Sequence, residues 1–203
     1  MIKIKKEKNK TKLSVYLFMG RSGCGKGTQI ELFKKKLKIN NNKILCIESG
    51  PILKNFAKGN SYTQKLTKKI VEVGGLLPES IAICRWQQYL IKNFTGKENI
   101  IFDGISRKFL EAQILDKTLK FYNIQKYKVI HINTSSSWCT EKLLARNRKD
   151  DTKKGIEKRM KWYDTDVSQS INFFKNNKDC EFIDVNGEQT IEQVHNEIIK
   201  KVF

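Results

Sequence analysis

Short apolar runs alternate along the chain with segments in which apolar residues recur every three or four positions. The runs have the length of strands, and because nearly every position in them is apolar, we expect them to be buried on both faces. They cover residues 13–19, 43–47, 99–103, 127–133 and 180–185. Five buried strands separated by helices predict a parallel sheet between two layers of helices, a three-layer α/β/α fold of the α/β class.

The segments between the runs predict amphipathic helices. After the first run, Ile30, Phe33 and Leu37 share one helical face. Residues 52–93 are predicted to be mostly helical, with breaks at Gly59-Asn60 and at 74–78. Further helices are expected over 109–122, 137–146, about 152–175 and from about 190 onward.

The 203 residues suffice for one domain with a core of its own. No apolar run approaches the ~20 residues of a membrane-spanning helix, so we expect no membrane partner. Residues 1–12 are basic but lack the apolar stretch of a secretory signal. We interpret them as a solvated, flexible arm in front of a single domain at 13–203, and we expect a monomer.

The cysteines indicate the compartment. There are five, and none forms a C-x-x-C pair. An odd, scattered set argues against a disulfide framework and against zinc, and it predicts a reducing compartment, hence the cytoplasm. His131 and His195 lie far apart without ligand-type neighbours, so we interpret both as ordinary strand and helix residues.

The net charge of +19 would suit a nucleic-acid surface, but its distribution does not. Lysines are spread along many segments, with 34 Lys against 6 Arg. We therefore expect a generally basic surface, with nucleic acid an unlikely partner. In a chain so rich in lysine, each arginine is a candidate phosphate ligand, because its planar guanidinium can donate two hydrogen bonds to phosphate oxygens at once and the lysine ammonium cannot. The six are Arg21, Arg85, Arg107, Arg146, Arg148 and Arg159.

A glycine-rich segment follows the first predicted strand and precedes a helix. It fits G-x-x-x-x-G-K, and its backbone N–H groups are expected to surround the phosphates of ATP. Lys26 is expected to reach the β- and γ-phosphates, and Thr28 to help hold Mg²⁺. The predicted ATP-binding residues of this loop are Gly20, Gly23, Cys24, Gly25, Lys26, Gly27 and Thr28.

Two further motifs carry charge. Residues 100–107 end a strand in Asp103, followed by Gly104 and Arg107. Asp103 is expected to orient Mg²⁺ through water, and Arg107 to hold the phosphate of an acceptor. Residues 143–159 contain three arginines suited to neutralising a transferring phosphoryl group. The predicted catalytic residues are Lys26, Arg107, Arg146, Arg148 and Arg159, with Asp150 and Asp151 as lid or positioning residues.

Together these motifs resemble the adenylate kinase family of nucleoside monophosphate kinases, within the P-loop NTPase type of fold. Gly27 stands between the lysine and the hydroxyl residue, as in that family, and D-G-I-S-R resembles its D-G-F-P-R, with Ile105 and Ser106 replacing Phe and Pro. The arginine–aspartate cluster resembles its lid. The resemblance implies a helical acceptor-binding insertion at about 49–78 and a very short lid at about 146–151, without zinc.

The resemblance also implies further binding residues. Lys142 stands where the family packs an arginine on the donor adenine, and Gln189 lies in the segment beside that base. Lys54 replaces an arginine that binds the acceptor phosphate. The implied acceptor-binding residues are Ser49, Gly50, Lys54, Gly75, Leu76, Leu77, Gly104, Arg107, Glu111, Arg148 and Arg159.

The acceptor base is left open by Glu111, which stands where the family places a glutamine that binds adenine. An ionised glutamate only accepts hydrogen bonds, which suits the N–H and NH₂ edge of guanine better than adenine. Alternatively Glu111 lies on a helix face and the base is bound elsewhere. The expected activity is Mg²⁺-dependent, reversible transfer from ATP to a nucleoside monophosphate, first AMP, with GMP, CMP, UMP and dTMP as alternatives.

Two rival functions remain from the sequence alone. One is another small-molecule kinase with the same phosphate loop. The other is an ATPase of this fold with an RNA or ribosome-assembly partner, which the net charge favours slightly.

Overall fold

The computed structural model describes residues 13–39, 43–146, 148 and 151–203. The predicted arm at 1–12 and Asp150 lie outside the described residues. Five strands form one parallel sheet in the order β2-β3-β1-β4-β5. They are β1 (Val15–Gly20), β2 (Ile44–Glu48), β3 (Asn99–Asp103), β4 (Tyr127–Asn133) and β5 (Cys180–Asn186). The predicted three-layer fold is confirmed.

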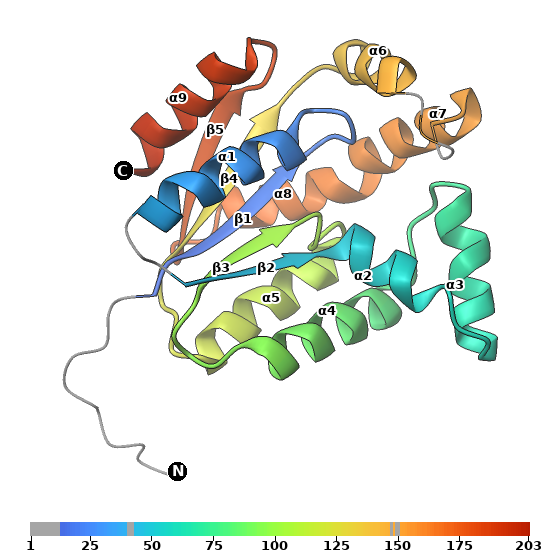
Figure 1. Cartoon of the computed structure of the whole chain (residues 1–203), viewed down its shortest axis with the longest axis horizontal. Helices are drawn as coiled ribbons and strands as arrows, with labels where there is room; N and C mark the ends of the chain where they lie inside the picture. The colour runs from blue at the N-terminus through green and yellow to red at the C-terminus, as the bar shows by residue number, and fades with distance from the viewer. Residues whose placement is uncertain (1–12, 40–42, 147, 149–150) are drawn as a thin grey trace.

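Helices cover both faces of this sheet (Figure 1). One face packs on α1 (Lys26–Ile39), α6 (Ser136–Arg146), α7 (Lys153–Trp162) and α9 (Ile191–Val202). The other packs on α4 (Glu79–Asn93), α5 (Phe109–Phe121) and α8 (Ser168–Lys175). Strand β1 serves both layers, because Leu17 faces the second set while Tyr16 and Phe18 pack edge-on against Phe33 of α1.

Two shorter helices lie beyond the sheet. They are α2 (Ser49–Phe56) and α3 (Tyr62–Glu72), which together with the loop to 78 form the predicted helical insertion. Ser61 and Gln64 form a capping box that begins α3, which explains the predicted break at Gly59-Asn60. Figure 1 shows α2, α3, α6 and α7 gathered at the ends of the strand arrows, so loops from both layers meet there.

The helix predicted over about 152–175 is confirmed as a helical segment without a break over 153–175, but it contains a π-helical turn that was not predicted. A π-helical turn, η1 (Tyr163–Val167), separates α7 from α8. The Tyr163 hydroxyl lies 2.7 Å from His131 Nε2, and Asp164 Oδ1 accepts a hydrogen bond from Arg21 at 2.6 Å. The consecutive residues Tyr163 and Asp164 thus contact two different partners, His131 and Arg21. We infer that these contacts favour the wider π-helical turn, which hydrophobic periodicity does not predict.

The described residues include no helix with both the length and the apolarity needed to cross a membrane. All five cysteines lie within the described part of the chain and are free thiols.

Candidate functional site

A groove runs along the carboxyl ends of β1 and β3, the edge at which open parallel sheets bind ligands. The phosphate loop, α2, the loop after β3, α6, α7 and the segment after β5 all contribute to its wall. The predicted residues that line it are Gly20, Gly23, Cys24, Gly25, Lys26, Gly27, Thr28, Ser49, Gly50, Lys54, Gly75, Asp103, Gly104, Arg107, Lys142, Arg146, Arg148, Arg159 and Gln189. Residues far apart in the sequence are thus brought to one surface.

The phosphate loop is shaped by close backbone packing. Gly23 has a φ of +93°, and a Cβ there would lie 2.8 Å from the carbonyl oxygen of Cys139. Only glycine satisfies both conditions. The loop closes through a hydrogen bond from Cys24 N to Arg21 O at 3.2 Å and leads directly into α1. The N-terminus of α1 therefore presents N–H groups to the groove, an arrangement that favours an anion.

Lys26 occupies the mouth of this loop. Its ammonium donates hydrogen bonds to the carbonyl oxygens of Gly20 and Arg21, each at 2.8 Å. These bonds keep the charge beside the loop, where phosphate oxygens can exchange for carbonyl oxygens without moving the main chain.

Arg21 does not line the groove, although its rarity marked it as a possible phosphate ligand. Its Nε donates to Thr134 O at 3.1 Å, and its guanidinium carbon lies 4.2 Å from the centre of the Tyr163 ring. With the ion pair to Asp164, these contacts tie the phosphate loop to β4 and to the π turn. Arg21 is therefore a structural support for the loop.

The predicted magnesium ligands Thr28 and Asp103 both line the groove. Asp103 ends β3, and Thr28 lies in the first turn of α1. Burial raises the pKa of Asp103 above its ordinary value, against the opposing charges of Lys26 and Arg107. Hydroxyl and carboxylate oxygens suit Mg²⁺, which is usually held by one or two protein oxygens together with nucleotide phosphates and water. The described residues hold no cluster of three or more His, Cys, Asp or Glu.

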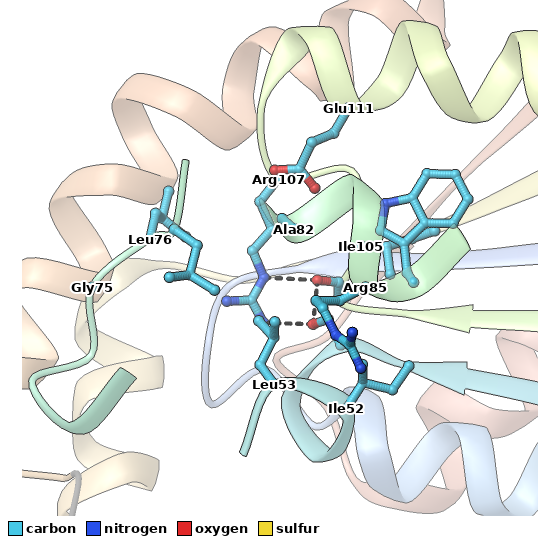
Figure 2. A pocket seen from close by; sticks show the side chains of 13 residues that line it. Ile52, Leu53, Gly75, Leu76, Ala82, Arg85, Ile105, Arg107 and Glu111 are labelled. Atoms are coloured by element: carbon cyan, nitrogen blue, oxygen red, sulfur yellow. Dashed lines mark hydrogen bonds between the residues drawn. The ribbon is translucent and has the colours of Figure 1, made fainter. Parts of the chain in front are cut away.

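Arg107 is held at the acceptor side by neutral oxygens. Its Nε donates to Gly104 O at 2.7 Å, and its Nη2 donates to Ser49 Oγ at 3.2 Å, as Figure 2 shows. Ser49 Oγ in turn donates to Gly104 O at 2.7 Å. Among the described residues Arg107 forms no ion pair, so its charge is available to an anionic ligand. The Trp162 ring covers the guanidinium at 5.4 Å.

A smaller cavity opens beside Arg107 and shares part of its wall with the groove (Figure 2). Its apolar lining comes from Ile52, Leu53, Leu76, Leu77, Ala82, Trp86 and Ile105. Its charged side chains are Arg85, Arg107 and Glu111. Mostly apolar walls with a few polar groups are typical of a pocket for a planar organic ligand. The predicted acceptor residues Leu76, Leu77 and Glu111 all lie here.

The arginines of the predicted lid meet on one carboxylate. Asp151 is fully buried and accepts hydrogen bonds from Arg146 at 2.9 Å, through both nitrogens, and from Arg159 at 2.7 Å. Burial alone would raise the pKa of Asp151, but these hydrogen bonds hold it far below its ordinary value. Arg148 is exposed, and its backbone N–H donates to the same carboxylate at 3.2 Å. Asp151 therefore positions Arg146 and Arg159 at the edge of the groove.

Three groove or cavity residues were missed from the sequence. Trp138 lies under the Lys142 ammonium at 4.7 Å, and its spacing of four residues from Lys142 on one helix could have revealed it. Trp162 donates from its indole to Gly74 O at 3.1 Å, and no local pattern marks it. Arg85 was noted only as a rare arginine.

Known proteins resemble this chain over most of its length. Residues 18–179 match the family model described as adenylate kinase. An adenylate kinase of Prochlorococcus marinus is 30% identical over 182 residues, covering 90% of this chain and 94% of that protein. Adenylate kinase 1 of Nostoc sp. is 27% identical and covers 90% of this chain and 95% of its own. The same identity to an adenylate kinase of Leptospira biflexa extends over 92% of this chain and 98% of that protein. With the phosphate loop, the D-G-x-x-R turn and the arginine–aspartate cluster on one groove, these matches show that the chain belongs to the adenylate kinase family.

Proposed function

We propose that this protein transfers the γ-phosphoryl group of ATP to AMP, reversibly, with two ADP as products. The observation that carries the proposal is the joining of two anion-binding regions in one groove. The phosphate loop lies in one part, Arg107 and its apolar cavity lie in the other, and arginines of α6 and α7 line the same wall. A groove of this kind holds a donor and an acceptor phosphate together.

In this proposal the donor binds along the phosphate loop. The loop N–H groups and Lys26 bind the β- and γ-phosphates, and Cys24 contributes through its backbone. The donor base lies against Lys142 and Trp138, with Gln189 at its edge. Gln189 is already fixed there, because its amide donates to Asn186 O and Glu197, each at 2.8 Å.

The acceptor binds beside the loop after β3. Arg107 and Lys54 hold its phosphate, and the cavity lined by Leu53, Leu76 and Leu77 holds its base. Ser49, Gly50, Gly75 and Gly104 bring backbone or small side chains close to it. Arg148 and Arg159 complete the charge around the acceptor phosphate.

Catalysis needs no covalent intermediate. Arg146, Arg148 and Arg159 neutralise charge that spreads over the transferring group, and Asp151 keeps two of them oriented. Thr28 and Asp103 would hold Mg²⁺, directly or through water, and the ion supplies charge neutralisation between the phosphates. Closure of the 49–78 insertion and of the short lid over both nucleotides excludes water, which otherwise accepts the phosphoryl group.

We also propose that the protein acts as a monomer in the cytoplasm. The free, scattered cysteines suit a reducing compartment, and every residue assigned a role lies on a single chain.

The test is ADP formation from Mg-ATP with AMP, GMP, CMP, UMP, dTMP or no acceptor, at two salt concentrations. Strong dependence on AMP is expected. Slow hydrolysis that no monophosphate changes would overturn the proposal and favour an ATPase with a macromolecular partner.

A further inference from the structure

Glu111 is a carboxyl group buried in the wall of the acceptor cavity. It lies in the first turn of α5, and 4% of the residue is exposed. Figure 2 shows its carboxyl group directed toward the Arg107 side chain, yet within the described residues it forms no ion pair. Burial favours its neutral acid, whereas a hydrogen bond from the Arg107 backbone favours the carboxylate, so a proton or a donor from a ligand can each stabilise the group.

Glu111 is the acidic side chain among the described residues that line the cavity. The apolar walls can pack on the faces of a purine, and Arg85 Nε and Trp86 Nε1 are buried donors without a hydrogen-bond partner among the described residues. Of the two arginines, Arg107 is directed to Gly104 and Ser49. Arg85 donates to Gln88 at 2.6 Å and stacks on the Phe56 ring at 4.2 Å. Glu111 is thus the lining side chain whose hydrogen-bonding pattern changes with its protonation state.

The two protonation states of a carboxyl group match different purines. A neutral acid has one O–H donor and one carbonyl acceptor, which is the pattern that pairs with N1 and the N6 amino group of adenine. A carboxylate has only acceptors, which pair with the N1–H and N2 amino groups of guanine.

We propose that Glu111 recognises both purines, pairing with adenine as a neutral acid and with guanine as a carboxylate, so that acceptor choice changes with pH. The proposal rests on the proposed function and adds a second acceptor, a 6-oxopurine nucleoside monophosphate, to the same site.

Groups on two sides of Glu111 set the balance between the states. Burial raises the pKa of Glu111 above its ordinary value. Glu79 on α4 acts in the same direction, while Arg107, its backbone and Lys108 oppose it. The N-terminus of α5 also favours the charged form. An acceptor phosphate bound at Arg107 offsets that arginine's charge, so the bound acceptor favours the neutral acid further.

The first test is the ratio of kcat/KM for AMP to kcat/KM for GMP, measured from about pH 5.5 to about pH 9. The ratio cancels the ionisation of the acceptor phosphate and of groups on the donor side, which affect both substrates alike. Above the pKa of Glu111 the ratio should fall by up to about tenfold per pH unit, because the neutral fraction falls at that rate.

Two variants show whether Glu111 is the titrating group. Glu111→Gln keeps one donor and one acceptor without titrating, so its ratio should favour AMP and stay flat with pH. Glu79→Gln removes the same charge from α4, where Glu79 pairs with Lys108, and should shift the profile to slightly lower pH without flattening it.

A second measurement uses the unmodified protein alone. Calorimetric titration in buffers of different ionisation enthalpy should show that AMP binding takes up protons near neutral pH, up to about one per AMP, relative to GMP binding. Equal proton uptake for AMP and GMP, a flat ratio in the unmodified protein, or an unchanged slope in Glu111→Gln would each overturn the inference. AMP phosphorylation with a flat ratio overturns this inference alone, whereas no phosphorylation of either purine overturns the proposed function as well.

Discussion

The proposed donor and acceptor ends of the groove are built from different parts of the polypeptide. At the donor end the phosphate loop uses backbone N–H groups, placed by Gly23 and its neighbours and by the start of α1. At the acceptor end side chains form the pocket, with Arg107, Glu111 and an apolar lining from four separate segments. Every residue type except proline offers the same backbone N–H, so the loop depends on where glycines occur, while the acceptor end depends on each side chain.

The departures from the family resemblance that the sequence shows fall on side chains, at Lys142 near the donor base as well as at the acceptor end. The donor loop keeps the family pattern, since few other sequences give that backbone. The acceptor end carries Lys54, Ser106 and Glu111 where the family has arginine, proline and glutamine. An acceptor pocket made of side chains can change its preference one residue at a time, which a loop made of amides cannot do.

Removing the lysine of the donor loop should have the largest effect. Lys26→Ala should lower kcat about 10²–10³-fold with AMP, because one preorganised positive group leaves the transferring phosphate. Steady-state kinetics with Mg-ATP measure this loss. The matched control is Lys35→Ala, an exposed lysine on the same helix, which should change kcat less than about twofold. A Lys26 variant with normal kcat would contradict the donor assignment.

Arg107→Lys tests whether the acceptor end acts separately from the donor end. Lysine cannot keep both donor contacts to Gly104 and Ser49 while binding a phosphate. We expect kcat/KM for AMP to fall roughly 30- to 100-fold, since hydrogen bonds to charged groups are each worth about 1.5–3 kcal/mol. The KM for ATP should stay within about twofold. An equal rise in both KM values would show that the two ends are not independent.

The carboxylate that joins α6 to α7 contributes to stability as well as to geometry. Asp151→Asn removes the buried carboxylate charge that Arg146 and Arg159 share, and should lower the free energy of unfolding by about 3 kcal/mol. Urea unfolding near neutral pH measures this. Glu157→Gln, an exposed acidic residue on α7, is the control and should be nearly neutral.

The pH dependence of stability follows from the depressed pKa of Asp151. The unfolded chain binds a proton at this carboxyl near pH 4, before the folded protein does. The stabilisation is therefore present above about pH 4 and is lost as the pH falls toward the folded-state pKa. The difference between the unmodified protein and Asp151→Asn should shrink over that range. A difference that stays constant below about pH 4 would contradict this assignment.

The smallest effect is expected in the turn that carries Arg107. Ser106 is fully buried with a φ of +57°, and its hydroxyl has no hydrogen-bond partner among the described residues. Ser106→Gly removes a left-handed strain of about 1–2 kcal/mol, partly offset by the greater freedom of glycine in the unfolded chain. The melting temperature should rise about 2–4 °C. Ser106→Ala removes only the hydroxyl and separates the two causes, and a Ser106→Gly variant that melts lower than the unmodified protein would sink the strain argument.

Local patterns were enough to predict most of the architecture. The five strands follow from continuous apolar runs, and the phosphate loop follows from glycine spacing between a strand and a helix. The position of Asp103, Gly104 and Arg107 could be predicted because they lie at or just after the end of a strand. In a parallel sheet the carboxyl ends of neighbouring strands share one edge. Glu111 could be identified as the uncertain position because it departs from a motif.

Tertiary structure decided the contacts between distant segments. From the sequence Arg21 could have been a phosphate ligand, but its contacts with Thr134, Tyr163 and Asp164 place it outside the groove. Tyr163 and Asp164 belong to the π turn within the helix predicted over 152–175. Asp151 was one of two adjacent aspartates until burial between Arg146 and Arg159 distinguished it. Periodicity and glycine spacing report the backbone and the side that faces the core, because those depend on near neighbours. The direction of a charged side chain depends on which partner lies within hydrogen-bond distance, and only the packed chain determines that.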